Sequence, residues 1–437
     1  MKKIFQLSWP VMCSLILQNL LGTVDMMYVG KLGTIQLSSV GISNSILNVI
    51  FVLSTLVSSG VIAIVSQNYG QQNLKEVKEI GGQSYLLSLI LGLTISILSL
   101  IFAKEMLKIF FNPDIQTLNN SYKFSVIAFS GIVIVFLNST LRTILQAIGD
   151  TKTPLFVFGF ANLINVVLDP ILMFKFNMGI QGAALATVIS NIIGCILITI
   201  MVIRKIYESN LKQFFTYLRL NLLNTKRILK IGGWACIKEV ARPFTGMLMT
   251  SLVYYVGKNA GNAAFSAGMQ LLNYTFIFLN GLCSAIAILV GQSIGKGEIE
   301  ECDVIIKSGI KLGFVNMLVF SIVYFIFPEY IMKLFSQDTQ VINMGVSYLR
   351  IVYVGIVFVV YPMILGGVFQ GAGDTFPPMI SSIVANVALK LPIAYILAVS
   401  LNLGTNGVWI SISLSVIIEA IMIIYYYKKE TWKEIVV

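Results

Sequence analysis

The chain contains the same pattern of residues twice, and this internal repeat limits the folds open to it more than any other feature. Residues 146–151 (QAIGDT) return 224 positions later as residues 370–375 (QGAGDT). Gln67 with Gly70, and Gly179 with Gly182, return 225 positions later. Three matches in one order at nearly one offset indicate a duplicated unit, because chance would not keep both the order and the spacing.

The repeat lies in a strongly apolar chain. Of its 437 residues 57% are hydrophobic and 11% are charged, whereas about 25% are charged in a typical soluble domain. Because about 20 apolar residues cross a bilayer as a helix, we predict an all-α membrane protein. Its twelve transmembrane helices are expected at residues 4–29, 37–65, 80–103, 121–148, 154–176, 181–206, 228–256, 262–292, 304–327, 343–370, 377–400 and 406–427.

Six of these helices fall in each half of the chain. An even number lets both halves insert in the same orientation, so we predict two six-helix lobes related by a pseudo-twofold axis along the membrane normal. The N-lobe would comprise residues 1–206 and the C-lobe residues 228–437, joined by a polar linker at residues 207–227. Repeats of this kind are typical of transporters, whose substrate sites lie between the repeats.

The net charge of +11 follows the predicted topology. Nineteen Lys and Arg residues lie in the tails and in the loops assigned to the cytoplasm, and eight lie on the opposite side. By the positive-inside rule both termini are cytoplasmic. The basic segment 204–230 is interpreted as a topogenic linker that also meets anionic lipid, so we expect membrane lipids as partners and no nucleic acid.

The composition also argues against several kinds of chemistry. The five cysteines are odd in number and four lie inside predicted helices, which predicts apolar filling without a disulfide framework. The chain has no histidine, so any proton transfer falls to carboxylates. Because it also has no ATP-binding or metalloprotease motif, we expect no enzyme and no cofactor. Transport would be driven by an ion gradient or be passive.

One protease motif does occur. Residues 371–374 (GAGD) match the sequence of intramembrane aspartyl proteases. Those enzymes need a second aspartate in a neighbouring helix, whereas Asp374 falls in a predicted cytoplasmic turn and is duplicated as Asp150. The match is therefore interpreted as a repeated helix–turn element.

Five prolines lie within the predicted spans. A proline inside a helix removes one backbone hydrogen bond and bends the helix. Bends are therefore expected at Pro10, Pro170, Pro243, Pro362 and Pro392.

Two aspartates of the first half lie inside predicted spans, where a charge is costly and marks a functional candidate. Asp25 and Asp169 fall at similar depth in the outer half of the membrane. Asn165 is one turn before Asp169, and Thr187 reaches the same level from the next helix. These oxygens suit a proton or Na⁺; capping of a kinked backbone is the structural alternative. The second half has no matching acid, which favours function, because a structural role should repeat.

The second half carries a different set of charges near mid-depth. Lys238, Glu239 and Arg242 lie in one predicted helix and Lys390 in another, which gives this set a net charge of +2. Glu239 and Arg242 are three residues apart, a spacing at which they can pair. The set either neutralises itself inside the bundle or meets a substrate or counter-ion in a central cavity. Glu419 lies nearer the cytoplasmic end and is interpreted as structural.

Taken together, these segments resemble the multidrug and toxic compound extrusion (MATE) family over essentially the whole chain. None of the segments is specific alone, but their combination is. The resemblance rests on Pro10, Gln18 and Asp25, on residues 30–33 (GKLG), 67–70 (QNYG), 145–151 (LQAIGDT), 168–170 (LDP) and 179–184 (GIQGAA), and on the echoes at 291–295 and 370–378.

The resemblance implies a bacterial multi-pass protein of the cytoplasmic membrane that exports amphipathic organic cations by alternating access, in antiport with H⁺ or Na⁺. The self-contained two-lobe plan favours a monomer. Carried over by position, the ion-coupling site, and the possible Na⁺ site, would comprise Asp25, Asn165, Asp169 and Thr187. The substrate cavity would include Gln18 and Asn138, and in the C-lobe Glu239, Arg242 and Lys390. The predicted helix 343–370 has no acid, which favours the branch of the family that couples through the N-lobe.

The basic residues of the second half favour an alternative function. A lipid-linked glycan flippase of the same superfamily carries a phosphate-bearing substrate, which Lys and Arg would bind well. An exporter of cations and a flippase are therefore both open at this point.

Overall fold

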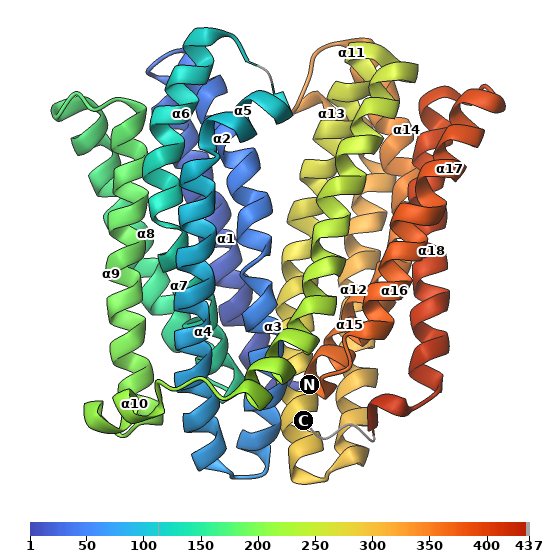
Figure 1. The fold of residues 1–437 in the computed structure, drawn as a ribbon. Coiled ribbons are helices and arrows are strands. Elements are labelled where there is room, and N and C mark those ends of the chain that lie inside the picture. Colours follow the sequence, from blue (N-terminus) through green and yellow to red (C-terminus); the bar gives the residue numbers. More distant parts are fainter. Residues whose placement is uncertain (112, 434–437) are drawn as a thin grey trace. The chain divides into compact units, whose positions relative to one another are not determined.

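A computed structural model describes residues 1–111 and 113–433, and in this part of the chain the regular structure is helical, without strands (Figure 1). The contacts divide the chain into two units. The N-terminal unit is Trp9–Gly232, and the C-terminal unit combines Met1–Ser8 with the chain from Gly233 onward. The predicted boundaries differ, since they place the first eight residues in the N-lobe and 207–227 in a separate linker.

The N-terminal unit is built from helices α1 to α10, the long ones lying side by side. Their bounds are α1 (Lys2–Gly30), α2 (Thr34–Val52), α3 (Thr55–Gly70), α4 (Leu74–Ile101), α5 (Ala103–Phe111), α6 (Ile115–Ser130), α7 (Ile132–Ala147), α8 (Lys152–Pro170), the π-helical turn η1 (Ile171–Lys175), α9 (Ile180–Ile206) and α10 (Leu211–Tyr217).

The C-terminal unit repeats this plan with more interruptions. Its elements are α11 (Leu222–Lys296), α12 (Ile299–Ile326), α13 (Pro328–Lys333), α14 (Thr339–Ile356), the 3₁₀ turn η2 (Val357–Val359), α15 (Val360–Ala372), α16 (Phe376–Ser382), the π-helical η3 (Ile383–Leu389), α17 (Lys390–Tyr395), the π-helical η4 (Ile396–Ser400), α18 (Gly404–Lys428) and the 3₁₀ turn η5 (Thr431–Lys433).

Twelve membrane crossings emerge from the described helices. Ten helical segments are long and apolar enough to span a membrane, and α6 with α7, bent by 44°, forms one more span. The 75 residues of α11 would extend for about 110 Å, far beyond the roughly 30 Å of hydrocarbon in a bilayer. A left-handed residue, Lys258 (φ 50°), breaks α11 into two helices and so supplies the twelfth span.

Three of the five prolines adjoin departures from α geometry. Pro170 ends α8 directly before η1, Pro392 lies in α17 between η3 and η4, and η2 ends three residues before Pro362. A π or 3₁₀ turn is a local change of hydrogen-bond register, which is how a helix absorbs a missing N–H donor. Pro10 and Pro243 lie inside continuous α-helix.

The repeated hexapeptide forms the same turn in both units. Gly149 (φ 91°) and Gly373 (φ 84°) both adopt the left-handed conformation that glycine allows at a helix end. In each copy the following aspartate N–H donates to a carbonyl five residues back: Asp150 to Leu145 at 2.9 Å, and Asp374 to Phe369 at 2.9 Å. The duplicated sequence is thus a duplicated structure, and residues 371–374 are part of a helix end.

Asp150 also anchors its turn to α9. Its carboxylate accepts hydrogen bonds from the Lys205 ammonium and, at 3.0 Å, from the backbone N–H of Thr153. Burial would raise the pKa of Asp150, but these hydrogen bonds outweigh burial and hold the pKa below its usual range. Asp150 is therefore ionised at neutral pH, and its contribution to stability is lost only in acid.

The predicted linker is largely helical and packs on the N-terminal unit. The Tyr207 hydroxyl donates to the Lys78 carbonyl at 2.7 Å, and the Tyr207 ring meets Phe214 of α10 edge to face. Both residues are buried. This burial explains why residues 207–217 belong to the compact unit.

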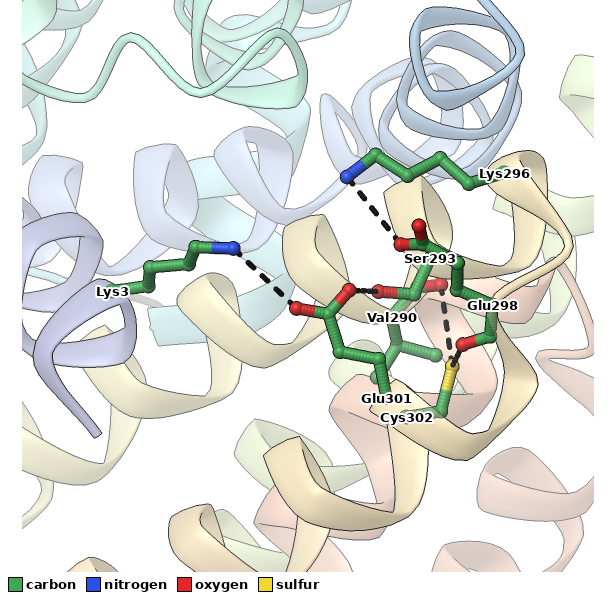
Figure 2. Close-up of polar contacts among 7 residues, drawn as sticks. All are labelled: Lys3, Val290, Ser293, Lys296, Glu298, Glu301 and Cys302. Carbon is green, nitrogen blue, oxygen red and sulfur yellow. Dashed lines mark hydrogen bonds and ion pairs between the residues drawn. The ribbon is translucent and has the colours of Figure 1, made fainter.

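The first eight residues belong to the C-terminal unit because one apolar and one charged side chain are held there. Ile4 is buried in the core of that unit, and the Lys3 ammonium lies 3.4 Å from the Glu301 carboxylate. Figure 2 shows Glu301 also accepting from the Ser293 hydroxyl, at 3.1 Å. The Lys3 side chain is 73% exposed, so the ion pair contributes little, about 0–1 kcal/mol, and Ile4 is the main anchor.

All five cysteines are free thiols. Cys195, Cys236 and Cys302 are buried, while Cys13 and Cys283 are half-buried.

The close packing of α15 on α11 gives a first prediction. A Cβ at Gly371 would collide with the backbone oxygen of Ala287, whereas a Cβ at Gly246 meets nothing within 4 Å. Gly371→Ala should lower the free energy of unfolding by about 1–3 kcal/mol, because backbone cannot move aside as a side chain can. Thermal unfolding in detergent measures this. Gly246→Ala is the control and should be neutral or slightly stabilising; equal melting temperatures for the two variants would contradict the packing.

Candidate ion and substrate sites

The four predicted ion-coupling residues lie together in the N-terminal unit. Three helices carry them: Asp25 is on α1, Asn165 and Asp169 are on α8, and Thr187 is on α9. Asn165 and Asp169 are fully buried, 1% and 0% exposed. The carboxyl groups of Asp25 and Asp169 both lie beside the side-chain amide of Asn165. The first helix of the chain and the consecutive pair α8 and α9 therefore meet at one polar cluster.

Asn165 connects the members of this cluster. In one orientation its Nδ2 lies 3.4 Å from Asp169 Oδ1 and 3.5 Å from Thr187 Oγ1, both long for hydrogen bonds. With the amide turned over, its nitrogen donates to Asp25 Oδ1 at 3.2 Å and its oxygen accepts from the Thr187 backbone N–H at 3.2 Å. The second orientation satisfies both ends of the amide, and it ties α1 to α9 through α8.

Asp169 remains incompletely satisfied. Its Oδ2 is buried and has no hydrogen-bond donor among residues 1–111 and 113–433. A buried carboxylate oxygen without a donor or a counter-charge is costly. The cluster therefore favours the arrival of a positive charge at Asp169.

The cluster borders a cavity in the same unit. This cavity has a volume of about 140 Å³, and its polar wall consists of Asp25, Asn44, Thr187 and Asn191. A space of this size holds several water molecules. Asp25 and Thr187 thus face the cavity, while Asn165 and Asp169 lie behind them.

The two predicted cavity residues of the N-lobe differ in their surroundings. Asn138 is buried, and its Nδ2 donates to the backbone oxygen of Asn191 at 3.1 Å, next to the cavity wall. Its Oδ1 is buried without a partner in the described part of the chain. Gln18 is exposed and does not line this cavity. The structure therefore brings Asn138, but not Gln18, to the ion cluster.

In the C-terminal unit the ion pair of Glu239 is with Lys238. Glu239 pairs with its neighbour Lys238, whose Nζ lies 3.1 Å from Glu239 Oε1. Arg242 is near enough to Glu239 to interact electrostatically, but it forms no ion pair in the described structure. The flexible Lys238 side chain reaches the carboxylate first, which a spacing of three residues did not reveal.

Sequence reasoning underestimated Glu419. This residue on α18 is buried, and its Oε2 accepts from Asn386 Nδ2 at 3.0 Å. It also interacts electrostatically with both Arg242 and Lys390. The available signal was Asn386 itself, because a buried amide inside a span favours a hydrogen-bond partner on a neighbouring helix.

The comparisons with known proteins follow the same duplication. A family profile described as MatE matches residues 10–171 and again residues 235–396. The two matches fall in the two halves that the internal repeat predicts. The chain belongs to the MatE family. Members of this family are membrane transporters, so this MatE protein is a transporter and not an enzyme.

The relatives are similar along their whole length. The probable multidrug resistance protein NorM of Thermotoga maritima is 26% identical over 437 residues, covering 99% of this chain and 93% of the relative. The multidrug export protein MepA of Staphylococcus aureus is 22% identical, covering 98% and 94%.

Solved structures show the same fold. A MATE protein in a bent conformation has a TM-score of 0.91 at 22% identity, covering 99% of this chain and 96% of its own. A MOP superfamily transporter from Pyrococcus furiosus, described with a binding pocket of reverse polarity, has a TM-score of 0.90 at 23% identity, covering 98% and 95%.

The central position of Asn165 gives a second prediction. Asn165→Ala removes the amide that links the carboxyl pair to α9, so it should lower the free energy of unfolding by about 1–3 kcal/mol. Chemical denaturation of the purified protein in detergent measures this loss. Asn162→Ala is the matched control, since Asn162 lies on the same helix and has no side-chain hydrogen bond to a described residue; its cost should stay below about 0.5 kcal/mol. A similar cost for both variants would assign the effect to α8 as a whole.

Proposed function

We propose that this MatE transporter exports amphipathic organic compounds, organic cations among them, in exchange for H⁺ or Na⁺ bound at Asp25 and Asp169. The observation that carries the proposal is the buried carboxyl pair, in which Asp169 Oδ2 has no donor in the described structure. The names of NorM and MepA support multidrug export as the broader activity.

The coupling ion follows from the charge of the pair. Two neighbouring carboxylates repel each other and lose hydration, so the pair gains free energy from a proton or a cation. A proton needs only the two carboxyl groups. Na⁺ is a hard cation that prefers oxygen ligands, and Asn165 and Thr187 add amide and hydroxyl oxygens. The donor set therefore fits either ion.

Antiport requires that ion and substrate oppose each other's binding. Such coupling is reciprocal: an ion that lowers the affinity for the substrate is itself bound less tightly when the substrate is present. In the proposed cycle the ion neutralises the pair in the outward-open state and lowers substrate affinity. Inward release of the ion restores the charge and resets the carrier.

The cellular setting completes the proposal. The carrier works as a monomer in the bacterial cytoplasmic membrane, with both termini in the cytoplasm, as the excess of Lys and Arg in the assigned loops supports. The coupling ion is bound and released in each cycle, so no cofactor is needed.

Replacing one carboxylate gives a third prediction. Asp25→Asn or Asp169→Asn removes a charge that the ion must meet, so ion-driven export should fall by more than about tenfold. Proteoliposomes loaded with ethidium, and given separately a Na⁺ gradient and a pH gradient, measure this loss. The gradient that drives the wild-type protein names the ion.

The matched control is Asp114→Asn. Asp114 caps α6 through the backbone N–H groups of Gln116 and Thr117, at 3.0 Å each, and asparagine caps a helix equally well. Its export should equal that of the wild type. An Asp25→Asn variant that inserts correctly and exports at the wild-type rate, with unchanged ion dependence, would disprove coupling at this site.

A second candidate is the flipping of a lipid-linked anionic compound. The excess of basic side chains in the C-terminal unit, Lys238, Arg242 and Lys390, favours it, since these groups bind phosphate. Cells separate the two functions: an exporter confers resistance to cationic dyes, whereas a flippase alters the envelope.

A further inference from the structure

The C-terminal unit contains a group of buried and half-buried charges that the coupling mechanism does not use. We call it the basic cluster: Lys238, Glu239 and Arg242 of α11, Lys390 at the start of α17, and Glu419 of α18. Three cations face two acids, so the cluster has a net charge of +1. All five residues lie inside segments long and apolar enough to span the membrane, where an unbalanced charge is costly.

One cation and one acid of the cluster satisfy each other. Lys238 pairs with Glu239 at 3.1 Å, and its ammonium lies over Gly366 of α15, 4.0 Å from where a Cβ would be. Their side chains are 22% and 38% exposed. This pair contributes no net charge, and the imbalance therefore rests with the other three residues.

Arg242 and Lys390 have two acids near them. Arg242 interacts electrostatically with Glu239 and Glu419, Lys390 interacts with Glu419, and the two cations repel each other. Glu419 is buried, and one of its oxygens is already engaged by Asn386. One carboxylate therefore serves two cations and an amide.

The two cations have unused hydrogen-bond donors. In the described part of the chain neither Arg242 nor Lys390 forms a side-chain hydrogen bond or an ion pair, and none of their nitrogens is fully enclosed. Arginine carries five N–H donors and lysine three. These half-buried groups, on two helices far apart in sequence, converge near Glu419 with donors free to bind an acceptor from outside.

We propose that Arg242 and Lys390 form an anion-binding subsite that holds the carboxylate or phosphate of an amphipathic substrate. Arginine binds such groups through two parallel N–H donors, and lysine adds a point charge. One bound anionic group cancels the net charge of the cluster. The inference deepens the proposed function, on which it rests: the transported compounds include zwitterions, whose anionic group meets this subsite.

A mutual-neutralisation role would leave a different pattern. It would need as many acids as cations, whereas Lys238, Arg242 and Lys390 face only Glu239 and Glu419 in the described structure. The cluster is therefore one acid short of neutrality, and the missing negative charge is the one that a substrate supplies.

Two dyes that differ in one charge test the subsite. Tetramethylrhodamine carries a free carboxylate, and its methyl ester does not, while both keep the cationic ring system. Fluorescence anisotropy with the purified full-length protein, without any gradient, should show the free acid binding about tenfold more tightly than the ester. Arg242→Gln and Lys390→Gln should each remove most of this preference and leave ester binding within about twofold.

The controls separate recognition from structure. Arg204→Gln removes an exposed arginine at the end of α9 and should keep the full preference, and Arg242→Lys, which retains the charge, should keep part of it. Equal affinity of the wild-type protein for both dyes would overturn the subsite. So would a parallel loss of both dyes in the Gln variants, because a structural defect does not distinguish them.

Two further arms identify the source of the anion and isolate the coupling site. If dodecyl phosphate displaces the free acid, and this displacement requires Arg242, the subsite is supported and accepts a lipid-type headgroup. If only carboxylate-bearing dyes displace the free acid, the subsite is supported for small molecules. The dye preference is measured on the wild-type protein without a gradient, and ion-driven export is measured on the same preparation. A preference that survives while ion coupling fails upholds the subsite alone, and the reverse result upholds coupling alone.

Discussion

The cost of a charge in hydrocarbon is the constraint on which the functional architecture of this transporter depends. A membrane-spanning helix can keep an ionised side chain only where protein, water or a ligand replaces the lost hydration. The N-terminal unit meets this cost with two carboxyl groups, Asn165 and a small cavity. The C-terminal unit meets it with a lysine–glutamate pair and a single shared glutamate. The first solution leaves an excess of negative charge and the second an excess of positive charge.

The duplicated sequence shows which features the fold itself requires. The glycine–aspartate turn at the end of α7 returns at the end of α15 with the same hydrogen bond and nearly the same φ. Gly182 and Gly407 both pack against the backbone of the preceding π-helical turn. A Cβ added at Gly182 would lie 2.8 Å from that backbone, and one added at Gly407 would lie 2.6 Å from it. Backbone geometry requires glycine at these positions in both units. The charged side chains obey no such rule, and the two halves have diverged there.

Most of the fold could be predicted from the sequence, because the length of an apolar segment decides whether it crosses a membrane as a helix. Ten predicted spans each correspond to one or more consecutive described helices, and the other two, 228–256 and 262–292, are the parts of α11 on either side of Lys258. The bend between α6 and α7 was not predicted, since residues 121–148 form one apolar run and the break at Gly131 changes direction without changing hydropathy. The left-handed conformation of Lys258 was also not predicted, because the conformation of a single residue does not change the local composition.

For the sites, depth could be predicted and partners could not. Asp25, Asp169 and Thr187 were brought together by counting residues from the helix ends, which works when helices are straight and parallel. Glu419 and Arg242 lie at different distances from their helix ends and were assigned to different roles. Their proximity depends on packing between α11 and α18. Whether Glu239 pairs with Lys238 or with Arg242 depends on side-chain rotamers. Neither helix packing nor rotamer choice produces a periodic pattern in the sequence.

The distribution of the thiols has a practical consequence. The two half-buried cysteines fall in different units, Cys13 in the N-terminal one and Cys283 in the C-terminal one, while the other three are buried. The native chain therefore carries one partly accessible thiol in each unit. A pair of spin labels or fluorophores on these thiols would follow the separation of the two units through the transport cycle without any engineered cysteine.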